Sequence, residues 1–226
     1  KGARVTLKNG IFKADREMKI LVQNYSELTL EDMTLDAENI DGVYTLSNNF
    51  GKVTVKGESN ILSKNVAFDL YYNMMGAYSE GVNVTFDETF TGTVKGDIEY
   101  GAEVITEDWT EKTALVINGG TFLGKILLTS ETEKANITAY SGTFSDAAVA
   151  DYCAEDFKAV EDGENYKVVP KDYIVSSTNG KKYETVQEAV DNAEGETTLT
   201  LLADAEGDGI FVAEDKEITF DFAGFT

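Results

Sequence analysis

The chain has 226 residues, of which 41 are acidic, 19 are basic and none is histidine, so its formal net charge is −22. A charge this negative repels nucleic-acid phosphates, and the absence of histidine excludes histidine-based triads, histidine metal sites and histidine pH switches. The sole cysteine, Cys153, cannot form a disulfide within the chain, and no apolar run is long enough to span a membrane. We therefore expect no nucleic-acid partner and no membrane insertion.

Strand-like runs rich in Val, Ile, Thr, Phe and Tyr fill the first two thirds of the chain. They are VTLKNGIF (5–12), ILVQNY (20–25), LTLEDMTL (28–35), VYTLSNNF (43–50), VTVKGESNI (53–61), VAFDLYY (66–72), VNVTFDETFTG (82–92), LVINGGTF (115–122) and NITAYSGTF (136–144). Within each run apolar and polar residues alternate, which buries one face of a strand and exposes the other. The pattern predicts an all-β region.

These runs recur at intervals between 22 and 33 residues. One series of equivalent positions is Val5, Leu28, Val53, Val82, Leu115 and Ile137, and a second is Leu21, Tyr44, Phe68, Ile98 and Ile126. Self-similarity with a period of this length is typical of solenoids, in which equivalent strands of successive coils lie side by side. We therefore expect parallel pairing between neighbouring repeats.

Asparagines lie near the expected corners of these repeats. They are Asn9, Asn24, Asn48, Asn49 and Asn118. Two interpretations fit them equally well. The amides could stack from one repeat to the next, as in other stacked β structures, or the residues could be ordinary turn asparagines.

The pattern changes after about Ala147. The segment 146–170 reads as a short helix or irregular arm and then a strand, and it ends at the sole proline, Pro170. YETVQEAVDNAEG (183–195) predicts an amphipathic helix with a capping box of Thr185 and Glu188. Strands TTLTLLAD (197–204), GIFVAED (209–215) and EITFDFAGFT (217–226) follow. We therefore expect two domains, 1–169 and 170–226.

Three segments resemble a known family. INGGTFLG (117–124) and YSGTFSDAAVADYCAEDFKAVEDGENYKVVP (140–170) are similar to the closing coils of pectin-lyase-like right-handed parallel β-helix modules in large surface proteins of gut Gram-positive bacteria. KKYETVQEAVDNAEGETTLTLLADAEGDGIFVAEDKEITFDFAGFT (181–226) resembles the opening of such a module. The resemblance implies a right-handed parallel β-helix with a closing arm in 1–169, and the helix-led first coil of a second β-helix in 170–226. It also implies an extracellular location on the bacterial cell surface.

A closing module that precedes an opening module would leave both ends of the chain open. Open ends expose unpaired strand edges, which favour pairing with another chain. The apolar residues at these expected ends are Val5, Leu7, Ile218, Phe220 and Phe222. We expect either a piece of a longer protein or a subunit whose end completes the beginning of the next, and such head-to-tail contacts build filaments unless they close.

Candidate ligand-binding residues are few. Trp109, Tyr71, Tyr72 and Tyr78 could form a sugar-stacking surface on the lateral face, or they could pack inside the core. Asp204, Glu206 and Asp208 follow the spacing of a calcium-binding loop, although the strands expected on both sides favour a solvated acidic turn. We expect no other cofactor than this possible Ca²⁺.

Catalysis has weaker support in the sequence. A glycoside hydrolase needs two facing carboxylates, for which Asp87 with Glu88, or Glu107 with Asp108, are the candidates. A polysaccharide lyase needs a basic residue beside a carboxylate cluster, and the only arginines, Arg4 and Arg16, lie beside none. We therefore assign no catalytic residue and expect the protein not to be an enzyme.

Three functional hypotheses follow. The first is a non-catalytic structural or adhesive cell-surface module that associates head to tail with itself or with neighbouring modules. The second is a glycan-binding module whose lateral face contacts a polysaccharide or a host surface protein. The third is a carbohydrate-active enzyme. A fold alone does not choose among them.

Overall fold

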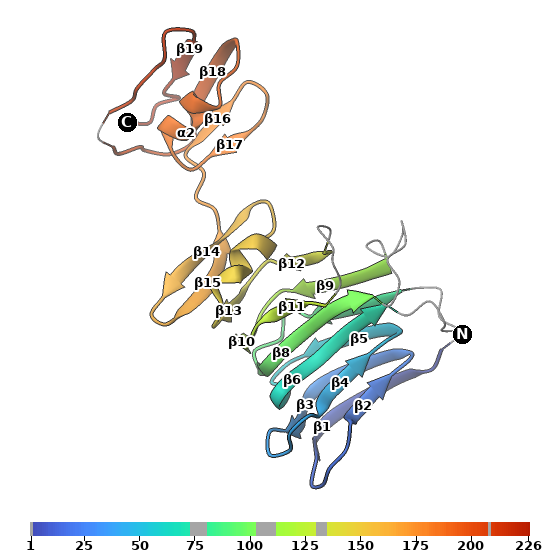
Figure 1. The fold of residues 1–226 in the computed structure, drawn as a ribbon. Helices are drawn as coiled ribbons and strands as arrows, with labels where there is room; N and C mark the ends of the chain where they lie inside the picture. The colour runs from blue at the N-terminus through green and yellow to red at the C-terminus, as the bar shows by residue number, and fades with distance from the viewer. Residues whose placement is uncertain (1, 73–80, 103–111, 130–134, 208) are drawn as a thin grey trace. The chain divides into compact units, whose positions relative to one another are not determined.

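The computed structural model describes residues 2–72, 81–102, 112–129, 135–207 and 209–226. It divides the chain into two compact units, Lys1–Pro170 and Lys171–Thr226 (Figure 1). Each unit has its own hydrophobic core. The two units are therefore described separately.

The described part of the first unit is built almost wholly of strands, followed by one short 3₁₀ helix and a closing hairpin. The strands are β1 (Arg4–Lys13), β2 (Ile20–Asn24), β3 (Glu27–Ala37), β4 (Tyr44–Asn48), β5 (Gly51–Lys56), β6 (Asn60–Tyr72), β7 (Val82–Phe86), β8 (Thr93–Ala102), β9 (Thr113–Ile117), β10 (Thr121–Leu123), β11 (Ile126–Leu128), β12 (Ile137–Ala139), β13 (Gly142–Phe144), β14 (Phe157–Asp162) and β15 (Asn165–Pro170). The 3₁₀ helix η1 covers Ala147–Tyr152.

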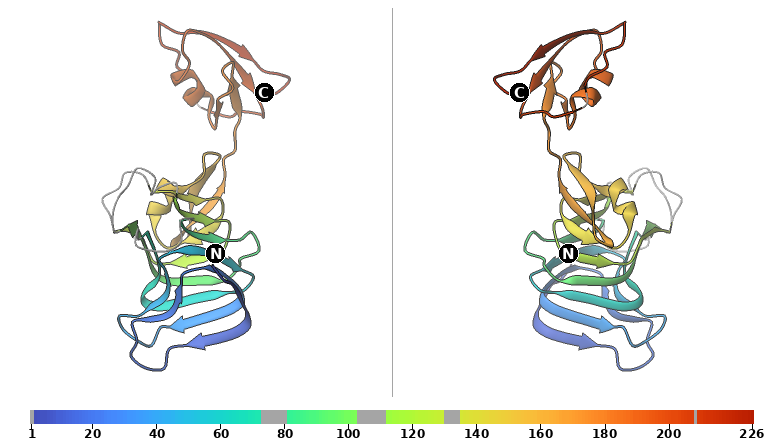
Figure 2. Two further views of the ribbon diagram at one scale, coloured as in Figure 1. Left: turned by 90° about the vertical axis from the view of Figure 1, so that its right-hand side faces the viewer. Right: turned by 90° about the vertical axis from the view of Figure 1, so that its left-hand side faces the viewer.

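These strands form one 15-stranded sheet. Its main order is β12-β9-β7-β5-β3-β6-β8-β10-β13-β15-β14, with β1 paired to β3, β11 to β8, and β2 to β6 through β4. The pairs from β1 to β13 are parallel, whereas β15 is antiparallel to both β13 and β14. The sheet is therefore mixed but mostly parallel, and it curls round until it is nearly closed, in the shape of a barrel (Figures 1 and 2).

The register aligns one apolar position from repeat to repeat. The aligned residues are Val5, Leu28, Val53, Val84, Leu115 and Ile137. All of them except Val5 are buried, because the alternation of each strand turns this position toward the interior. Parallel pairing between neighbouring repeats is thereby confirmed, with Val84 in the place predicted for Val82.

The right-handed parallel β-helix predicted from these repeats is wrong. In a solenoid, equivalent strands of successive coils form separate rows of parallel strands. Here the long strands β3, β6 and β8 each belong to more than one row, so the rows merge into a single curled sheet and do not form a solenoid. For example, β3 pairs with β5 through Glu27–Glu31 and with β6 through Thr34–Ala37. The repeat spacing predicts which strands are parallel neighbours, but it does not specify whether the rows stay separate or join through shared strands.

The long strands bend at residues with a left-handed backbone. Asn9 in β1 and Asp32 in β3 have φ angles of 54° and 52°, and the register of the two strands omits both residues. The next strand along, β5, is followed by Gly57, whose φ is 58°. Asparagine, aspartate and glycine are the residues that tolerate this conformation best. This line of residues therefore lets neighbouring strands change direction together.

Aromatic rings from β7, β10 and β13 pack together in the interior. Phe122 stacks on Phe144 with ring centroids 4.8 Å apart, and its ring meets that of Phe86 edge to face at 5.0 Å. Phe86 also lies 4.9 Å from Phe90. Offset and edge-to-face contacts of this kind add to the stabilisation from burial alone. The repeated phrases ending in Phe122 and Phe144 therefore supply consecutive layers of one core.

The second unit is a small mixed sheet with one helix. Its strands are β16 (Val175–Ser177), β17 (Lys182–Tyr183), β18 (Glu196–Leu201) and β19 (Glu217–Asp221), in the order β17-β16-β18-β19, and its helix is α2 (Val186–Asp191). The predicted helix is confirmed, since Thr185 Oγ1 accepts a hydrogen bond from Glu188 N at 3.1 Å. The prediction of the first coil of a second β-helix is wrong, because β18 and β19 are the only parallel pair among the described strands of this unit. In the described residues no helix has both the length and the apolar character needed to cross a membrane.

Candidate interaction site at the free strand edges

The predicted sugar-stacking residues do not form a surface in the described part of the chain. Tyr71 and Tyr72 end β6 and project to opposite faces. Tyr72 is buried, with its ring centroid 6.5 Å from that of Phe50, whereas Tyr71 is half-buried on the outer face. Trp109 and Tyr78 lie outside the described residues. Of the two candidates that the structure describes, Tyr71 is thus the one placed where a ligand could contact it.

In the predicted calcium loop, the side chain of Asp204 is hydrogen-bonded to Thr226. Asp204 Oδ1 accepts hydrogen bonds from Thr226 N at 2.8 Å and from Thr226 Oγ1 at 3.0 Å, and these bonds lower the pKa of Asp204. Glu206 is exposed, and Asp208 lies outside the described residues. No group of three or more Cys, Asp or Glu side chains that could hold a metal occurs among the residues described. Asp204 instead fastens Thr226 to the turn after β18.

A pair of carboxylates that was not predicted from the sequence lies on β6 and β8. Asp69 and Glu99 are register partners on these neighbouring strands. Asn48 N donates to Asp69 Oδ1 at 3.0 Å, and Tyr44 Oη donates to Glu99 Oε2 at 2.9 Å. Burial raises the pKa of Asp69, and burial together with the bond to Glu99 raises the pKa of Tyr44 to about 12. The predicted series of equivalent positions could have revealed this pair. Phe68 and Ile98 are equivalent in that series, and Asp69 and Glu99 are the residues that follow them.

Asp87, a candidate glycosidase carboxylate, has a structural role. Its Oδ1 accepts hydrogen bonds from Thr89 N at 3.1 Å and Thr89 Oγ1 at 2.9 Å, and its Oδ2 lies 3.8 Å from Lys56 Nζ. The bonds from Thr89 are the main reason why the pKa of Asp87 is lowered. Glu107 and Asp108 lie outside the described residues.

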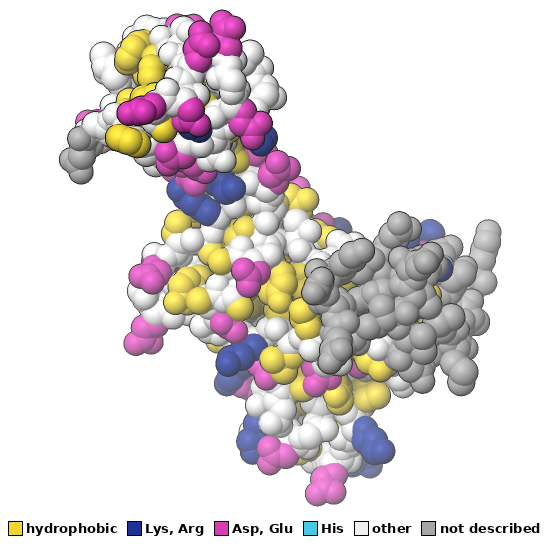
Figure 3. Space-filling view, turned by 45° about the horizontal axis from the view of Figure 1, so that its top comes forward, with side chains coloured by type: hydrophobic (Ala, Val, Ile, Leu, Met, Phe, Trp, Pro, Cys, Tyr) yellow, Lys and Arg dark blue, Asp and Glu magenta, His cyan; other side chains and the backbone are white. Residues whose placement is uncertain are grey.

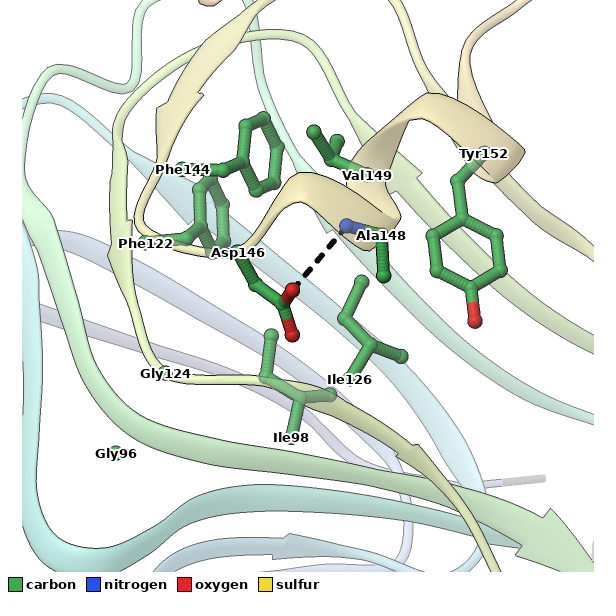
Figure 4. Close-up of a pocket in the computed structure, with 10 residues that line it drawn as sticks. All are labelled: Gly96, Ile98, Phe122, Gly124, Ile126, Phe144, Asp146, Ala148, Val149 and Tyr152. Carbon is green, nitrogen blue, oxygen red and sulfur yellow. Dashed lines mark hydrogen bonds between the residues drawn. The ribbon is translucent and has the colours of Figure 1, made fainter. Parts of the chain in front are cut away.

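A small cavity lies beneath η1 (Figure 4). Its volume is about 10 Å³, and Ile98, Ile126 and Val149 are among the apolar side chains that line it. Asp146 Oδ1 at its rim accepts a hydrogen bond from Ala148 N at 3.2 Å and so caps η1. A space of this size holds about one water molecule. The cavity is therefore a gap in packing with no room for a larger ligand.

The edge of β1 is the most unusual surface of the first unit. Among the described strands β1 pairs only with β3, so its other edge is free. Val5 is 43% exposed although its register partner Leu28 is 6% exposed, and Phe12 is 44% exposed although its partner Leu35 is fully buried. The difference arises because β1 covers β3 while no described strand covers β1. A further strand at this edge would bury both side chains, and each buried apolar side chain contributes about 1–3 kcal/mol.

Charges alternate in sign across the strands next to this edge. Arg4 Nε lies 2.7 Å from Glu27 Oε2, and Lys8 Nζ lies 2.8 Å from Glu31 Oε1. The following strand, β5, places Lys56 in register with Glu31. Basic and acidic side chains lie next to one another at this end of the unit in Figure 3. The outermost strand is thus basic, and its cations have acidic neighbours on one side only.

A third ion pair extends the same contact beyond the bend. Lys13 Nζ lies 2.9 Å from Asp36 Oδ2. Hydrogen bonding between the two raises the pKa of Lys13 and lowers the pKa of Asp36. Arg4, Lys8 and Lys13 therefore all pair with acidic side chains of β3, from one end of β1 to the other.

The second unit also has a free edge. Within the described residues β19 pairs only with β18. Ile218 and Phe220 are half-buried against the core of the unit, whereas Glu217 and Asp221 are exposed. The next residue, Phe222, is 58% exposed and lines a mostly apolar cleft of about 460 Å³ together with Phe220. The residues predicted at the chain's ends thus lie on the edge strands β1 and β19 or directly beside them.

Comparison with known proteins finds no family model, no curated protein and no solved structure that matches this chain. The resemblance to pectin-lyase-like β-helix modules is therefore wrong as a family assignment. The phrases that end in Phe122 and Phe144 encode parallel strands whose Phe side chains point inward, and the curled mixed sheet uses them in the same way.

Proposed function

We propose that this protein is a non-catalytic structural module that adheres to further chains through its free strand edges. The observation that carries the proposal is the edge of β1, where Val5 and Phe12 are exposed at positions that are buried in β3. Unpaired edges with exposed apolar side chains add strands from other chains, and proteins that stay monomeric cover or interrupt them. Arg4 and Lys8 of β1 already form ion pairs with β3, so their charges do little to prevent another strand from pairing at this edge.

Backbone geometry supports strand addition at this edge. Glu27 N donates to Ala3 O at 3.1 Å, which turns the N–H and C=O groups of Ala3 and Val5 toward β3. The backbone N–H and C=O groups of Arg4 and Thr6, which alternate with these residues, therefore point to the free edge. A new parallel strand would hydrogen-bond to these groups.

A single substitution tests the proposal. Proline in place of Thr6 removes an N–H that points to the free edge and makes none of the bonds to β3, so Thr6→Pro keeps the fold and blocks strand addition. Thr6→Ala is the matched control, since it keeps the N–H. Sedimentation velocity over a range of concentrations should show assemblies of the native protein and of Thr6→Ala, and monomers of Thr6→Pro. A native protein that stays monomeric at every concentration would overturn the proposal.

The glycan-binding alternative has less support among the described residues. Of the two candidate aromatics that the structure describes, Tyr72 faces the core and Tyr71 lies on the outer face.

A further inference from the structure

We infer that the strand that completes the β1 edge is β19 of a second copy of this chain, added parallel and in register, with Glu217 beside Arg4. The inference rests on the proposed association through strand edges and names its partner. It predicts a head-to-tail contact, because each copy offers β1 to one neighbour and β19 to another.

The first argument is the residue pattern of the strands. Successive strands of the first unit carry RVTLK (4–8), ELTLE (27–31), KVTVK (52–56) and NVTFD (83–87). These segments are aligned residue by residue, in the last of them as far as Phe86. Each has a polar residue at both ends, apolar residues in the second and fourth positions, and threonine in the third position. β19 has the same pattern, EITFD (217–221). β19 therefore fits as a further member of this row.

The second argument is charge. β1 carries Arg4 and Lys8, four residues apart, and β3 meets them with Glu27 and Glu31 at distances of 2.7 and 2.8 Å. β19 carries Glu217 and Asp221 at the same spacing. In the proposed register these carboxylates would flank Arg4 and Lys8 from the free side, which continues the alternation of sign across the row. Opposite charges at facing positions of neighbouring strands stabilise the pairing.

The sheet of the second unit leaves the charge of β19 uncompensated. Glu217 is in register with Glu196 of β18, and both side chains are exposed. Like charges at facing positions destabilise a strand pair. A basic strand on the other side of β19 would offset this repulsion, and β1 is such a strand.

The third argument is the apolar face. Ile218 and Phe220 are half-buried against the core of the second unit, and Leu7 packs in the same half-buried way against the core of the first. In the proposed register Val5 lies beside Ile218, and Leu7 lies beside Phe220. The contact would therefore join two incompletely covered apolar surfaces, and the 43% exposure of Val5 would fall.

The backbone groups have matching phases. Thr178 N donates to Thr198 O at 3.0 Å, so the backbone groups of Thr198 point toward β16. The N–H and C=O groups of the next residue, Leu199, therefore point to the other side, toward β19. Because Leu199 is in register with Phe220, the groups of Ile218 and Phe220 point away from β18 and toward the free edge. Thr6 N of a second copy would then donate to Ile218 O.

The two edges are also of opposite kinds. In each unit a residue in the connection between parallel neighbours packs against the core, namely Leu21 between β1 and β3 and Ala205 between β18 and β19. Such parallel connections are right-handed in nearly all proteins, which places the later strand on the same side in both units. β1 is the first strand of its row and β19 is the last of its sheet, so they offer complementary edges.

Disulfide trapping between two copies tests the register. In a Cys153→Ala background, one preparation carries Thr6→Cys and the other carries Thr219→Cys. These residues face each other in the proposed pair, and parallel neighbours lie about 4.8 Å apart, within the range for a disulfide. Oxidation of the mixture should give a disulfide-linked dimer, and it should form at least about fivefold less when Asp221→Cys, two residues out of register, replaces Thr219→Cys. Since each copy has one cysteine, a bond within one chain cannot produce this result.

Charge reversal on β19 gives a second readout that leaves β1 untouched. Glu217→Lys with Asp221→Lys should weaken association by about tenfold or more, because two ion pairs are replaced by two repulsions. These changes also remove the repulsion from Glu196, so this variant should fold at least as well as the native protein.

The outcomes separate the inference from the proposed function. Trapping in register together with weaker association of the reversed variant supports both. Assemblies that form without trapping, and that charge reversal leaves intact, would overturn the β1–β19 contact while end association stands. A native protein that is monomeric and is not trapped would overturn both.

Discussion

At the scale of single residues, Asp69 shows how the outer face of the sheet holds a half-buried carboxylate. The hydrogen bonds from Asn48 N and from the Ser47 side chain stabilise its charge, but burial outweighs them and the pKa of Asp69 is raised. The neighbouring Glu99 raises it further. The folded state therefore holds the proton of Asp69 more tightly than the unfolded state does.

The sign of the resulting pH dependence follows from this shift. Since the folded pKa lies above the unfolded one, Asp69 favours folding while it is protonated, and stability is lost as the pH rises through the folded pKa. Asp69→Asn keeps an oxygen that accepts from Asn48 N and removes the charge. We expect it to raise the free energy of unfolding by about 1 kcal/mol at neutral pH, and by less in acid. Urea denaturation at two pH values measures this, with the exposed Asp15→Asn as control, and equal effects at both pH values would contradict it.

Residue-scale features were predicted where they repeat from strand to strand. Asn24 Nδ2 donates to Asn48 Oδ1 at 2.9 Å, which confirms amide stacking for this pair. The pairing of Asp69 with Glu99 was not predicted, because acidic residues are too numerous in this chain for any one pair to stand out. Only the register brings these two together.

At the scale of elements, the parallel strands hold together through layers of phenylalanine. Phe122 of β10 is 2% exposed and contacts both Phe144 and Phe86. The next residue on the same strand, Leu123, faces outward and is 40% exposed. These neighbours therefore separate the effect of the core from that of the surface.

Phe122→Ala should lower the free energy of unfolding of the first unit by about 3–5 kcal/mol, because it removes a ring from the interior and leaves a cavity. Leu123→Ala should lower it by less than about 1 kcal/mol. Guanidinium denaturation followed by circular dichroism measures both values. Similar losses for the two variants would contradict the inward direction of Phe122.

The sequence predicted most of the strands, their parallel neighbours and the helix α2, because alternation, repeat spacing and a Thr185 cap are local signals. The strand predicted at 209–215 is wrong, since these residues form no strand. It did not predict the closure of the sheet. Closure depends on β3, β6 and β8 each joining two rows and on bends at Asn9 and Asp32, and a solenoid would show the same alternation.

At the scale of the whole molecule, each unit has a core of its own. The second core consists of Val175, Tyr183, Ala189, Val190, Leu199 and Leu201. None of these residues belongs to the core cluster of the first unit. The two units should therefore unfold independently.

Val190→Asp tests this independence by placing an unpaired charge in the second core, which unfolds a unit of this size. Hydrogen exchange followed by mass spectrometry should show fast exchange in 171–226 and unchanged protection in the first unit. Glu194→Ala, on the exposed side, should change neither. Loss of protection in both units would show that they fold as one, contrary to the account. The Val190→Asp variant should also fail to assemble, because unfolding of the second unit removes β19.

The central claim is that free strand edges join one chain to the next, and concentration-dependent hydrogen exchange tests it most directly. The amides of Thr6 and Lys8 point to the free edge of β1 and should exchange quickly in dilute protein. In concentrated protein they should become protected, and so should those of Ile218 and Phe220, while exposed turns stay unchanged. Assemblies in which all four amides exchange as quickly as in the monomer would contradict the claim.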